Sequence, residues 1–199
     1  MRVVAKIRQM FSQSWLRNLI NLALFQSVWV VSVIGAASGD GWHAFVALAV
    51  FVFIHHFLSI TSKADFQLAV IAVFLGIIAE TFFTRSGIII YSDSDFVAGL
   101  VPIWILVLWA NFALTFNGCL QWLHGRYWLA ALLGAAGGPI SYYIGIKLGA
   151  ATAGTPFFVL LAFVAVVYAA VAPLLLLIAK RLVSYTQTRD LLSDTDLNL

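Results

Sequence analysis

Six apolar segments divide this chain, and each is about long enough to cross a bilayer as a helix. They lie at residues 19–36, 42–60, 67–84, 98–118, 128–148 and 156–179. A helix needs ~20 apolar residues to cross the hydrocarbon core, whereas strands of a membrane barrel are about half that length. Hydrophobic residues make up 63% of the chain and charged residues 10%, against roughly 45–50% and about 25% in soluble domains. We therefore predict an all-α polytopic membrane protein, a bundle of six transmembrane helices over residues 19–182.

The two ends of the chain differ from this bundle in composition. Residues 1–18 are basic and amphipathic, with Val3 and Ile7 on one side of a helix and Lys6 on the other. This pattern predicts an interfacial helix on an anionic membrane surface, or a basic flank that only sets topology. Its mixture of charged and apolar residues is unlike a cleaved signal peptide. The short polar tail, 183–199, is expected to be disordered and cytoplasmic.

Lysine and arginine are distributed unevenly between the two ends of the predicted spans. One end receives Arg2, Lys6, Arg8, Arg17, Lys63, Arg126, Lys180, Arg181 and Arg189, and the other receives Arg85 and Lys147, with Asp40, Asp93 and Asp95 beside them. Basic residues mark the cytoplasmic side, so we predict a multi-pass inner (cytoplasmic) membrane protein with both termini in the cytoplasm. The pI of 9.2 follows from these flanks, and no nucleic-acid partner is expected.

Glu80 is the only carboxyl group inside a long apolar segment. A charged side chain in hydrocarbon costs several kcal/mol unless it faces a partner or water. One interpretation makes Glu80 catalytic, as a proton donor or acceptor. In the other interpretation it pairs with Arg85 or Lys147, or forms a polar contact between helices.

The polar and aromatic side chains of the spans sort into two layers by depth. The outer layer contains Glu80, Arg85, Trp104, Tyr142, Tyr143 and Lys147, and the inner layer contains Gln26, His55, His56, Asn111 and Asn117. The candidate ligand-binding residues are Trp104, Trp109, Asn111, Tyr142, Tyr143, Gln26 and His55. For the tryptophans, ordinary packing is the alternative. Because Glu80 and His55 fall in different layers, we expect no catalytic pair between them.

Other site chemistry is missing from the sequence. His55 and His56 point about 100° apart on a helix, so they cannot bind one ion together; we expect one to face the interior and the other the cytoplasmic interface. We predict no metal site and no cofactor, since the chain has no Walker loop, Rossmann glycine pattern, CxxC, HExxH or GxSxG. A single cysteine, Cys119, excludes a disulfide framework.

The fifth span is rich in glycine. Gly134 with Gly138, and Gly145 with Gly149, form small-xxx-small pairs that let helix backbones approach closely. Pro139 predicts a kink. One interpretation is close packing, which includes a homo-oligomer or a membrane partner at this helix. The other is a broken helix that exposes backbone polar groups to a cavity.

Several short blocks together resemble a known family. They are Phe25-Gln26, Trp29, Gly35, Glu80, Gly87, Pro102-Ile-Trp104, Leu108-Trp109, Trp122-Leu123, Gly134, Gly137-Gly138-Pro139, Tyr142-Tyr143, Gly145 and Leu148-Gly149. Over residues 19–150 the chain resembles the uncharacterised bacterial membrane family called domain of unknown function 2878. The resemblance implies a small integral membrane protein, often encoded near fatty-acid-modifying functions, which favours a lipid ligand. More distantly, Glu80 before Gly87-Ile-Ile-Ile-Tyr91 is similar to membrane carotenoid cyclases and hydratases, although the paired acidic motif of the cyclases is missing.

Three functions remain open from the sequence. The first is a membrane enzyme, or its partner subunit, that modifies a lipid or isoprenoid with Glu80 as acid or base. The second is a transporter or lipid-handling protein without chemistry, which requires a cavity open to one side. The third is an assembly subunit, which predicts a dry bundle without a cavity. The arrangement that separates them is a cavity bordered by Glu80 and the inner polar residues.

Overall fold

The computed structural model describes residues 2–92 and 101–196, with side chains described from residue 14 to 189 outside the gap. Within these ranges the helices are α1 (Arg2–Ala37), α2 (His43–Leu58), α3 (Ser62–Arg85), α4 (Ile103–Ala113), η1 (Gln121–Leu123, a 3₁₀ turn), α5 (Tyr127–Lys147) and α6 (Phe157–Asp196). Two short strands, β1 (Ile89–Tyr91) and β2 (Ala151–Ala153), complete the fold. The all-α prediction is therefore confirmed, with a small two-stranded sheet that the sequence did not indicate.

Four helices are long and apolar enough to cross a membrane. These segments are Ser14–Ala37, Ser62–Arg85, Tyr127–Lys147 and Phe157–Arg189. The other two are apolar but short, with 16 residues in α2 and 11 in α4, or about 24 and 17 Å of helix. The helix predicted over 98–118 is much shorter because it begins after Pro102 and gives way to turns beyond Ala113. The structure thus supports four spanning helices rather than all six.

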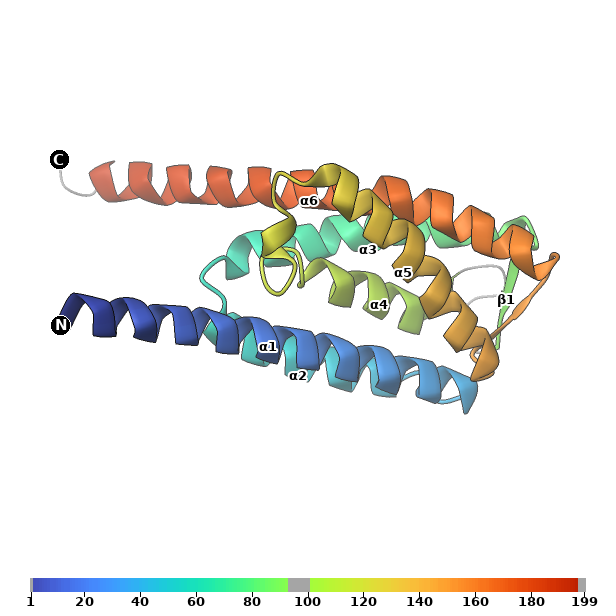
Figure 1. The fold of residues 1–199 in the computed structure, drawn as a ribbon. Coiled ribbons are helices and arrows are strands. Elements are labelled where there is room, and N and C mark those ends of the chain that lie inside the picture. Colours follow the sequence, from blue (N-terminus) through green and yellow to red (C-terminus); the bar gives the residue numbers. More distant parts are fainter. Residues whose placement is uncertain (1, 93–100, 197–199) are drawn as a thin grey trace.

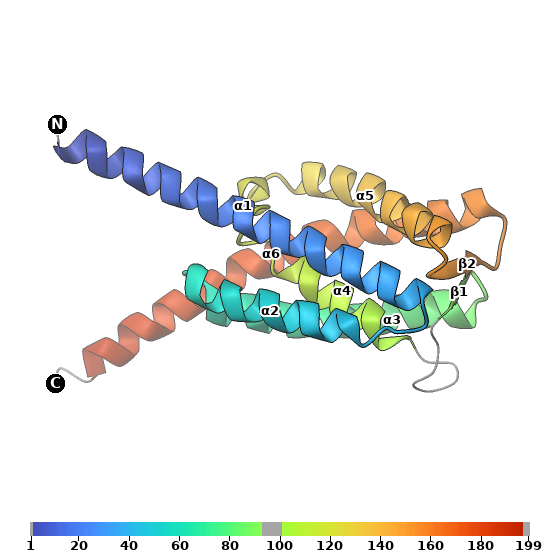
Figure 2. The same cartoon turned by 90° about the horizontal axis from the view of Figure 1, so that it is seen from below.

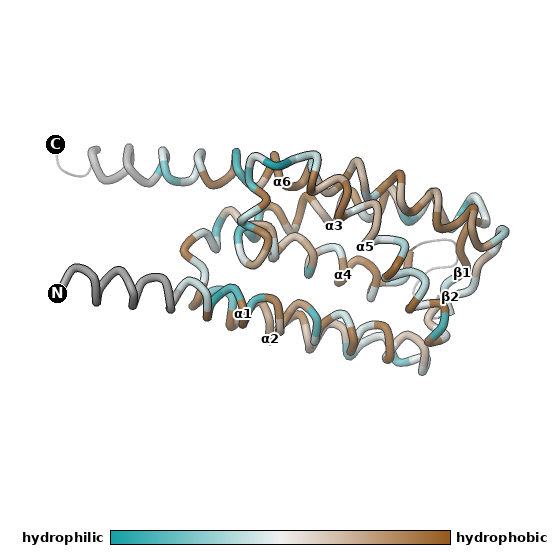
Figure 3. The backbone as a smooth tube through the Cα atoms, in the orientation of Figure 1, coloured by the Kyte–Doolittle hydropathy of each residue, from teal (hydrophilic) through white to brown (hydrophobic). Residues whose placement is uncertain are grey.

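The helices lie roughly parallel, with α4 in the interior. α1 packs on α2 and α4, α3 packs on α4 and α6, and α5 packs mainly on α6. Figures 1 and 2 show α1 and α6 projecting from the same end of the bundle, while β1 and β2 lie at the opposite end. Hydrophobic residues are frequent along the helices in Figure 3, although the glycine-rich α5 is paler than α6. Both ends of the chain therefore leave the bundle on one side.

The two terminal segments continue the first and the last helix without a break. α1 runs without a break from Arg2 to Ala37, so residues 2–17 extend the first span instead of forming a helix of their own. α6 continues to Asp196, which contradicts the expectation of a disordered tail over most of its length. No glycine or proline interrupts residues 2–34 or 174–196, so nothing in either segment stops helix propagation. Asp93 and Asp95 lie outside the described residues.

The small sheet fixes the chain where α3 ends. β1 pairs with β2 in antiparallel register, with Ile89 opposite Ala153 and Tyr91 opposite Ala151. Gly87 adopts a positive φ of 65° that allows the turn out of α3. Side chains on a strand alternate between faces, so Ile89 and Tyr91 are buried while Ile90 is exposed. The pairing thereby turns the Tyr91 side chain into the bundle.

The glycines of α5 pack against α6 within the same chain. A Cβ added at Gly134 would collide with the backbone carbonyl of Tyr168, and one at Gly138 would lie 2.8 Å from the Tyr168 ring. α5 stays helical through Pro139, so the broken helix is contradicted and close packing is confirmed for this pair. A Cβ added at Gly145 would meet no other atom within 4 Å. Gly149 takes a φ of 90° in the turn after the helix.

Adding one methyl group to α5 tests this contact. We expect Gly134→Ala to destabilise the protein by about 1–3 kcal/mol, because overpacking forces the two helices apart. Gly137→Ala is the matched control, since a Cβ there meets no other atom within 4 Å. Thermal unfolding in one detergent should show a lower apparent Tm for Gly134→Ala alone. Equal apparent Tm values for both variants would contradict the packing described here.

Candidate functional site

A cavity of about 420 Å³ lies between α1, α4, α5 and α6. Volumes of roughly 300–1,000 Å³ are usual for pockets that hold small ligands. Its walls are mainly apolar and aromatic, with Phe25 and Trp29 from α1 and Phe112 and Phe116 from α4 and the turn after it. Glu80 of α3 and Tyr91 of β1 border it toward the sheet end. A bundle with such a cavity does not fit the dry packing expected of a purely structural subunit.

Glu80 is held by hydrogen bonds from three neutral side chains. Tyr142 Oη and Trp109 Nε1 donate to Glu80 Oε1 at 2.5 and 3.0 Å, and Tyr91 Oη donates to Oε2 at 2.6 Å. These donors come from α5, α4 and β1 respectively. The carboxyl group therefore joins three elements to α3 and forms the polar end of the cavity.

Local packing explains why the three donors reach this carboxyl group. Gly76 lies one helical turn before Glu80, and a Cβ there would be 2.5 Å from the Trp109 ring. The glycine lets the indole lie flat against α3 so that Nε1 meets Oε1. Aromatic rings surround the cluster, with Tyr91 edge-on to Trp104 at 5.6 Å between centroids and Tyr142 near Tyr168 at 6.0 Å. Edge-on pairs of this kind are favourable contacts in their own right.

The cluster shields Glu80 from the cavity that it borders. The Glu80 side chain has no accessible surface, and Tyr91 and Trp109 are almost fully buried, whereas Tyr142 is only partly buried and lines the cavity. A ligand in the cavity would therefore meet Tyr142 before the carboxyl group. Both carboxyl oxygens already accept hydrogen bonds, so the chemistry available here is proton exchange through a tyrosine.

The cavity has a mouth on the side of the bundle between α1 and α5. Leu22 and Gln26 of α1 line the cavity and are exposed, as are Leu133 and Ile140 of α5. All four belong to two of the four segments that are long enough to span a membrane, Ser14–Ala37 and Tyr127–Lys147. The mouth therefore opens at the level of the apolar middle of the helices, not at their ends.

Five of the seven residues predicted to bind a ligand border this cavity. They are Gln26, Trp104, Trp109, Asn111 and Tyr142. Tyr143 is not among the lining residues; its ring lies 5.7 Å from Lys147 Nζ. His55 belongs to a separate polar cluster. Of the alternatives for Glu80, the ion pair with Arg85 or Lys147 is absent from the described structure, since Arg85 is exposed and Lys147 lies against Tyr143. The polar contact between helices is present.

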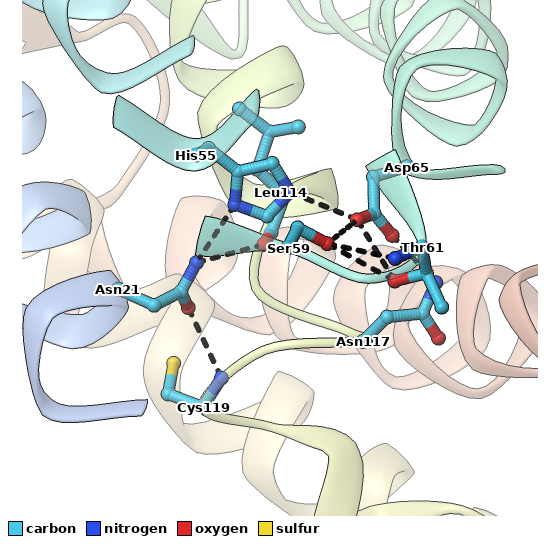
Figure 4. Close-up of polar contacts among 8 residues, drawn as sticks. All are labelled: Asn21, His55, Ser59, Thr61, Asp65, Leu114, Asn117 and Cys119. Carbon is cyan, nitrogen blue, oxygen red and sulfur yellow. Dashed lines mark hydrogen bonds and ion pairs between the residues drawn. The ribbon is translucent and has the colours of Figure 1, made fainter. Parts of the chain in front are cut away.

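The second cluster surrounds Asp65 at the opposite end of α3 (Figure 4). Asp65 Oδ2 accepts hydrogen bonds from His55 Nε2 at 2.8 Å, Ser59 Oγ at 2.7 Å and Thr61 Oγ1 at 3.0 Å. Asp65 Oδ1 accepts one from Asn117 Nδ2 at 2.7 Å. His55 is buried and His56 is exposed, so the prediction that one of the two faces the interior is confirmed.

Asn21 extends this cluster to α1. Its Nδ2 donates to Leu114 O at 3.0 Å and lies 3.4 Å from His55 Nδ1, while its Oδ1 accepts from Cys119 N at 3.0 Å. A Cβ at Gly118 would lie 2.5 Å from Asn21 Oδ1, so a larger residue there would displace the Asn21 amide. Burial raises the pKa of the Cys119 thiol to about 11, which leaves it protonated and unsuited to act as a nucleophile. We assign this cluster to helix packing.

Sequence reasoning missed two important residues. Asp65 stands in a polar stretch after the second span, which indicated a loop, yet its side chain is only 1% exposed. Tyr91 follows Glu80 outside the predicted spans. The only sequence signal for it was its place after Gly87 in the distant similarity to carotenoid cyclases and hydratases. Among the described residues, no three His, Cys, Asp or Glu side chains are placed to hold a metal ion.

Comparison with known proteins assigns the chain to a family. The model of a family described as "Protein of unknown function (DUF2878)" matches residues 18–174. The chain belongs to this family. The match reaches beyond the expected residue 150 and takes in most of the apolar part of α6, including Tyr168 at the cavity. No curated protein and no solved structure matches the chain.

Removing the charge at Asp65 tests the packing cluster. We expect Asp65→Asn to destabilise the protein by about 3 kcal/mol, because an amide nitrogen would face buried donors and His55 would lose its partner. Asp40→Asn is the control; this acid is half exposed and 3.6 Å from the exposed His43. Thermal unfolding of both variants in one detergent checks the difference. A similar apparent Tm for the two would remove the structural role assigned to Asp65.

Proposed function

We propose that this protein binds a lipid or isoprenoid in the cavity and modifies it by proton transfer, with Glu80 as the acid or base. The single observation that carries the proposal is the position of Glu80. It is the only glutamate in the chain, and it lies at one end of an apolar cavity under three aligned donors. Carboxyl groups in membrane spans are costly and commonly functional.

The shape of the cavity supports an apolar ligand taken from the bilayer. Its aromatic and aliphatic walls favour hydrocarbon, and its mouth between α1 and α5 is lined by Leu22, Leu133 and Ile140. A lipid chain could enter there without crossing water. The polar end beyond the mouth then places the reactive part of the molecule near Tyr142.

Tyr142 supplies the contact between ligand and acid in this proposal. Its hydroxyl donates to Glu80 at 2.5 Å and its ring lines the cavity. A proton passing between the Tyr142 oxygen and a ligand can be replaced from, or passed to, Glu80 along this hydrogen bond. Tyr91 and Trp109 keep the carboxyl group in position.

A second candidate is lipid binding or transport without chemistry. It is favoured because both carboxyl oxygens of Glu80 already accept hydrogen bonds and have no accessible surface. A third, an assembly subunit, would need a partner surface on α5. The Gly134 and Gly138 face is already covered by α6, so a homo-oligomer or membrane partner would use exposed residues such as Trp128 and Leu132.

We also propose that the protein resides in the inner (cytoplasmic) membrane with both termini in the cytoplasm. Both long terminal helices leave the same end of the bundle (Figure 1). That end carries Arg17, Lys63 and Arg126, as the distribution of basic residues requires. In this arrangement the shorter α2 and α4 complete six membrane passes around the cavity.

Lipid mass spectrometry of a deletion strain tests the proposed enzyme. A strain complemented with the wild-type chain should contain a lipid product that the deletion lacks. Glu80→Gln should lower that product by about 100-fold or more, as expected for loss of a general acid or base. The glutamine keeps an oxygen for Trp109 and Tyr142, so the protein should still accumulate in the membrane. Tyr142→Phe should lower the product as well.

Arg85→Gln is the matched control for this experiment. Arg85 lies on the same helix, near its end, but is exposed and away from the cavity, so its lipid profile should equal that of the wild type. If Glu80→Gln restores the product fully, the enzymatic proposal fails. A lipid that co-purifies unaltered with both wild type and Glu80→Gln would support binding without turnover instead.

A further inference from the structure

We propose that the cavity selects an electrically neutral lipid that carries a hydroxyl group, and rejects lipids with an ionised phosphate or carboxylate. This inference rests on the proposed function, because it names the class of ligand for the same cavity. It is carried by the charges and the unpaired polar atoms of the cavity wall.

The first observation is the absence of positive charge. Among the described residues that line the cavity there is no lysine, arginine or histidine. The nearby cations are directed elsewhere, since Lys147 lies against Tyr143 and Arg85 is exposed. An anionic headgroup in this apolar space would have no counter-charge, and burying an unpaired charge costs several kcal/mol. The cavity therefore disfavours fatty-acid anions, phospholipid phosphates and prenyl phosphates.

A cationic headgroup is disfavoured for a different reason. Among the described residues, Glu80 is the only acidic side chain on the wall. Its oxygens are covered by Tyr91, Trp109 and Tyr142 and have no accessible surface. An ammonium group could not reach the carboxyl oxygens without displacing one of these donors.

The second observation is a set of hydrogen-bonding atoms that suits a hydroxyl group. Tyr142 gives its proton to Glu80, so its oxygen is left to accept one. Asn111 Oδ1 is an acceptor, and Trp104 Nε1 a donor, without a partner in the described part of the chain. Both residues border the cavity, but these two atoms have almost no accessible surface, so the Tyr142 oxygen is the acceptor that a ligand meets first. A ligand hydroxyl can donate and accept at once, whereas an ester, a hydrocarbon or an ionised acid has no proton to give.

The middle of the cavity offers neutral polar groups as well. Asn111 Nδ2 donates to Phe25 O at 3.1 Å, which places this amide beside the residue that precedes Gln26. Gln26 is exposed at the mouth, within an otherwise apolar part of α1. An amide in hydrocarbon is costly unless it is hydrogen-bonded, and a hydroxylated lipid passing through the mouth would provide that bond.

Three photoreactive lipids with one chain length and different headgroups test this selectivity. The probes are a long-chain alcohol, the matching fatty acid and the matching amine, each with a diazirine and an alkyne, applied to the full chain in nanodiscs. At a pH where the acid and the amine are both charged, the alcohol should label the protein at least tenfold more than either. Excess unlabelled alcohol should compete, and labelled peptides should come from α1, α4 or α5. Preferential labelling by the acid or the amine would overturn the inference.

Two variants separate this inference from the proposed function. Gly145→Leu fills the cavity, since Gly145 is buried, lines the cavity and has open space at its Cβ; it should abolish labelling by the alcohol. Gln26→Lys adds a positive charge at the mouth and should raise labelling by the acid several-fold. Ser27→Lys, on the neighbouring exposed position outside the cavity, should leave the preference unchanged.

The outcomes separate lipid binding in this cavity from its selectivity for a neutral lipid with a hydroxyl group. If no probe labels the wild type, or Gly145→Leu labels as strongly as the wild type, lipid binding in this cavity fails and the proposed function fails with it. If all three probes label equally and Gly145→Leu blocks them, the cavity binds lipid but the selectivity for a neutral hydroxyl is wrong.

Discussion

The hydrogen bond from Tyr142 to Glu80 joins α5 to α3 across the end of the cavity. α5 packs mainly on α6, and α6 itself packs on α3, so this bond acts together with the α3–α6 contact in joining the pair to the rest of the bundle. In hydrocarbon no water replaces a broken hydrogen bond, and such a contact is therefore strongly maintained. The cavity and the carboxyl cluster are adjacent, because Glu80 and its three donors all border the cavity.

Asp65 has the corresponding role at the other end of α3. It lies 15 residues before Glu80, or about 22 Å along the helix axis. Asp65 accepts hydrogen bonds from α2, from the turn into α3 and from the segment after α4. Asn21 of α1 donates one to Leu114 in that last segment. Polar bonding at both ends of α3 allows the middle of the bundle to remain apolar and incompletely filled. A cavity can persist there because the helices are fixed above and below it.

The sequence predicted those features of the bundle that depend only on where a residue lies along its helix. The lengths of the apolar segments gave the helical fold, and the depths of Glu80 and Tyr142 placed them in one layer. Depth cannot give the direction in which a side chain points, so Tyr142 and its neighbour Tyr143 could not be told apart, although only Tyr142 reaches the acid. Asp65 was missed because its burial depends on His55 and Asn117 from other helices, and no local pattern records that. The short α4 depends likewise on turns that follow Ala113.

The donors around Glu80 also limit the chemistry that the site can perform. Three neutral groups from three elements donate hydrogen bonds to the carboxyl group, and no cation in the described part of the chain pairs with it. A ligand therefore responds to the acid only through Tyr142, the one member of the cluster that is partly exposed and lines the cavity. This geometry suits the transfer of a single proton at a hydroxyl group better than direct attack by a carboxylate. Because Tyr142 gives its proton to Glu80, the group that a ligand meets at this end of the cavity is an acceptor, which favours a ligand that can donate a hydrogen bond.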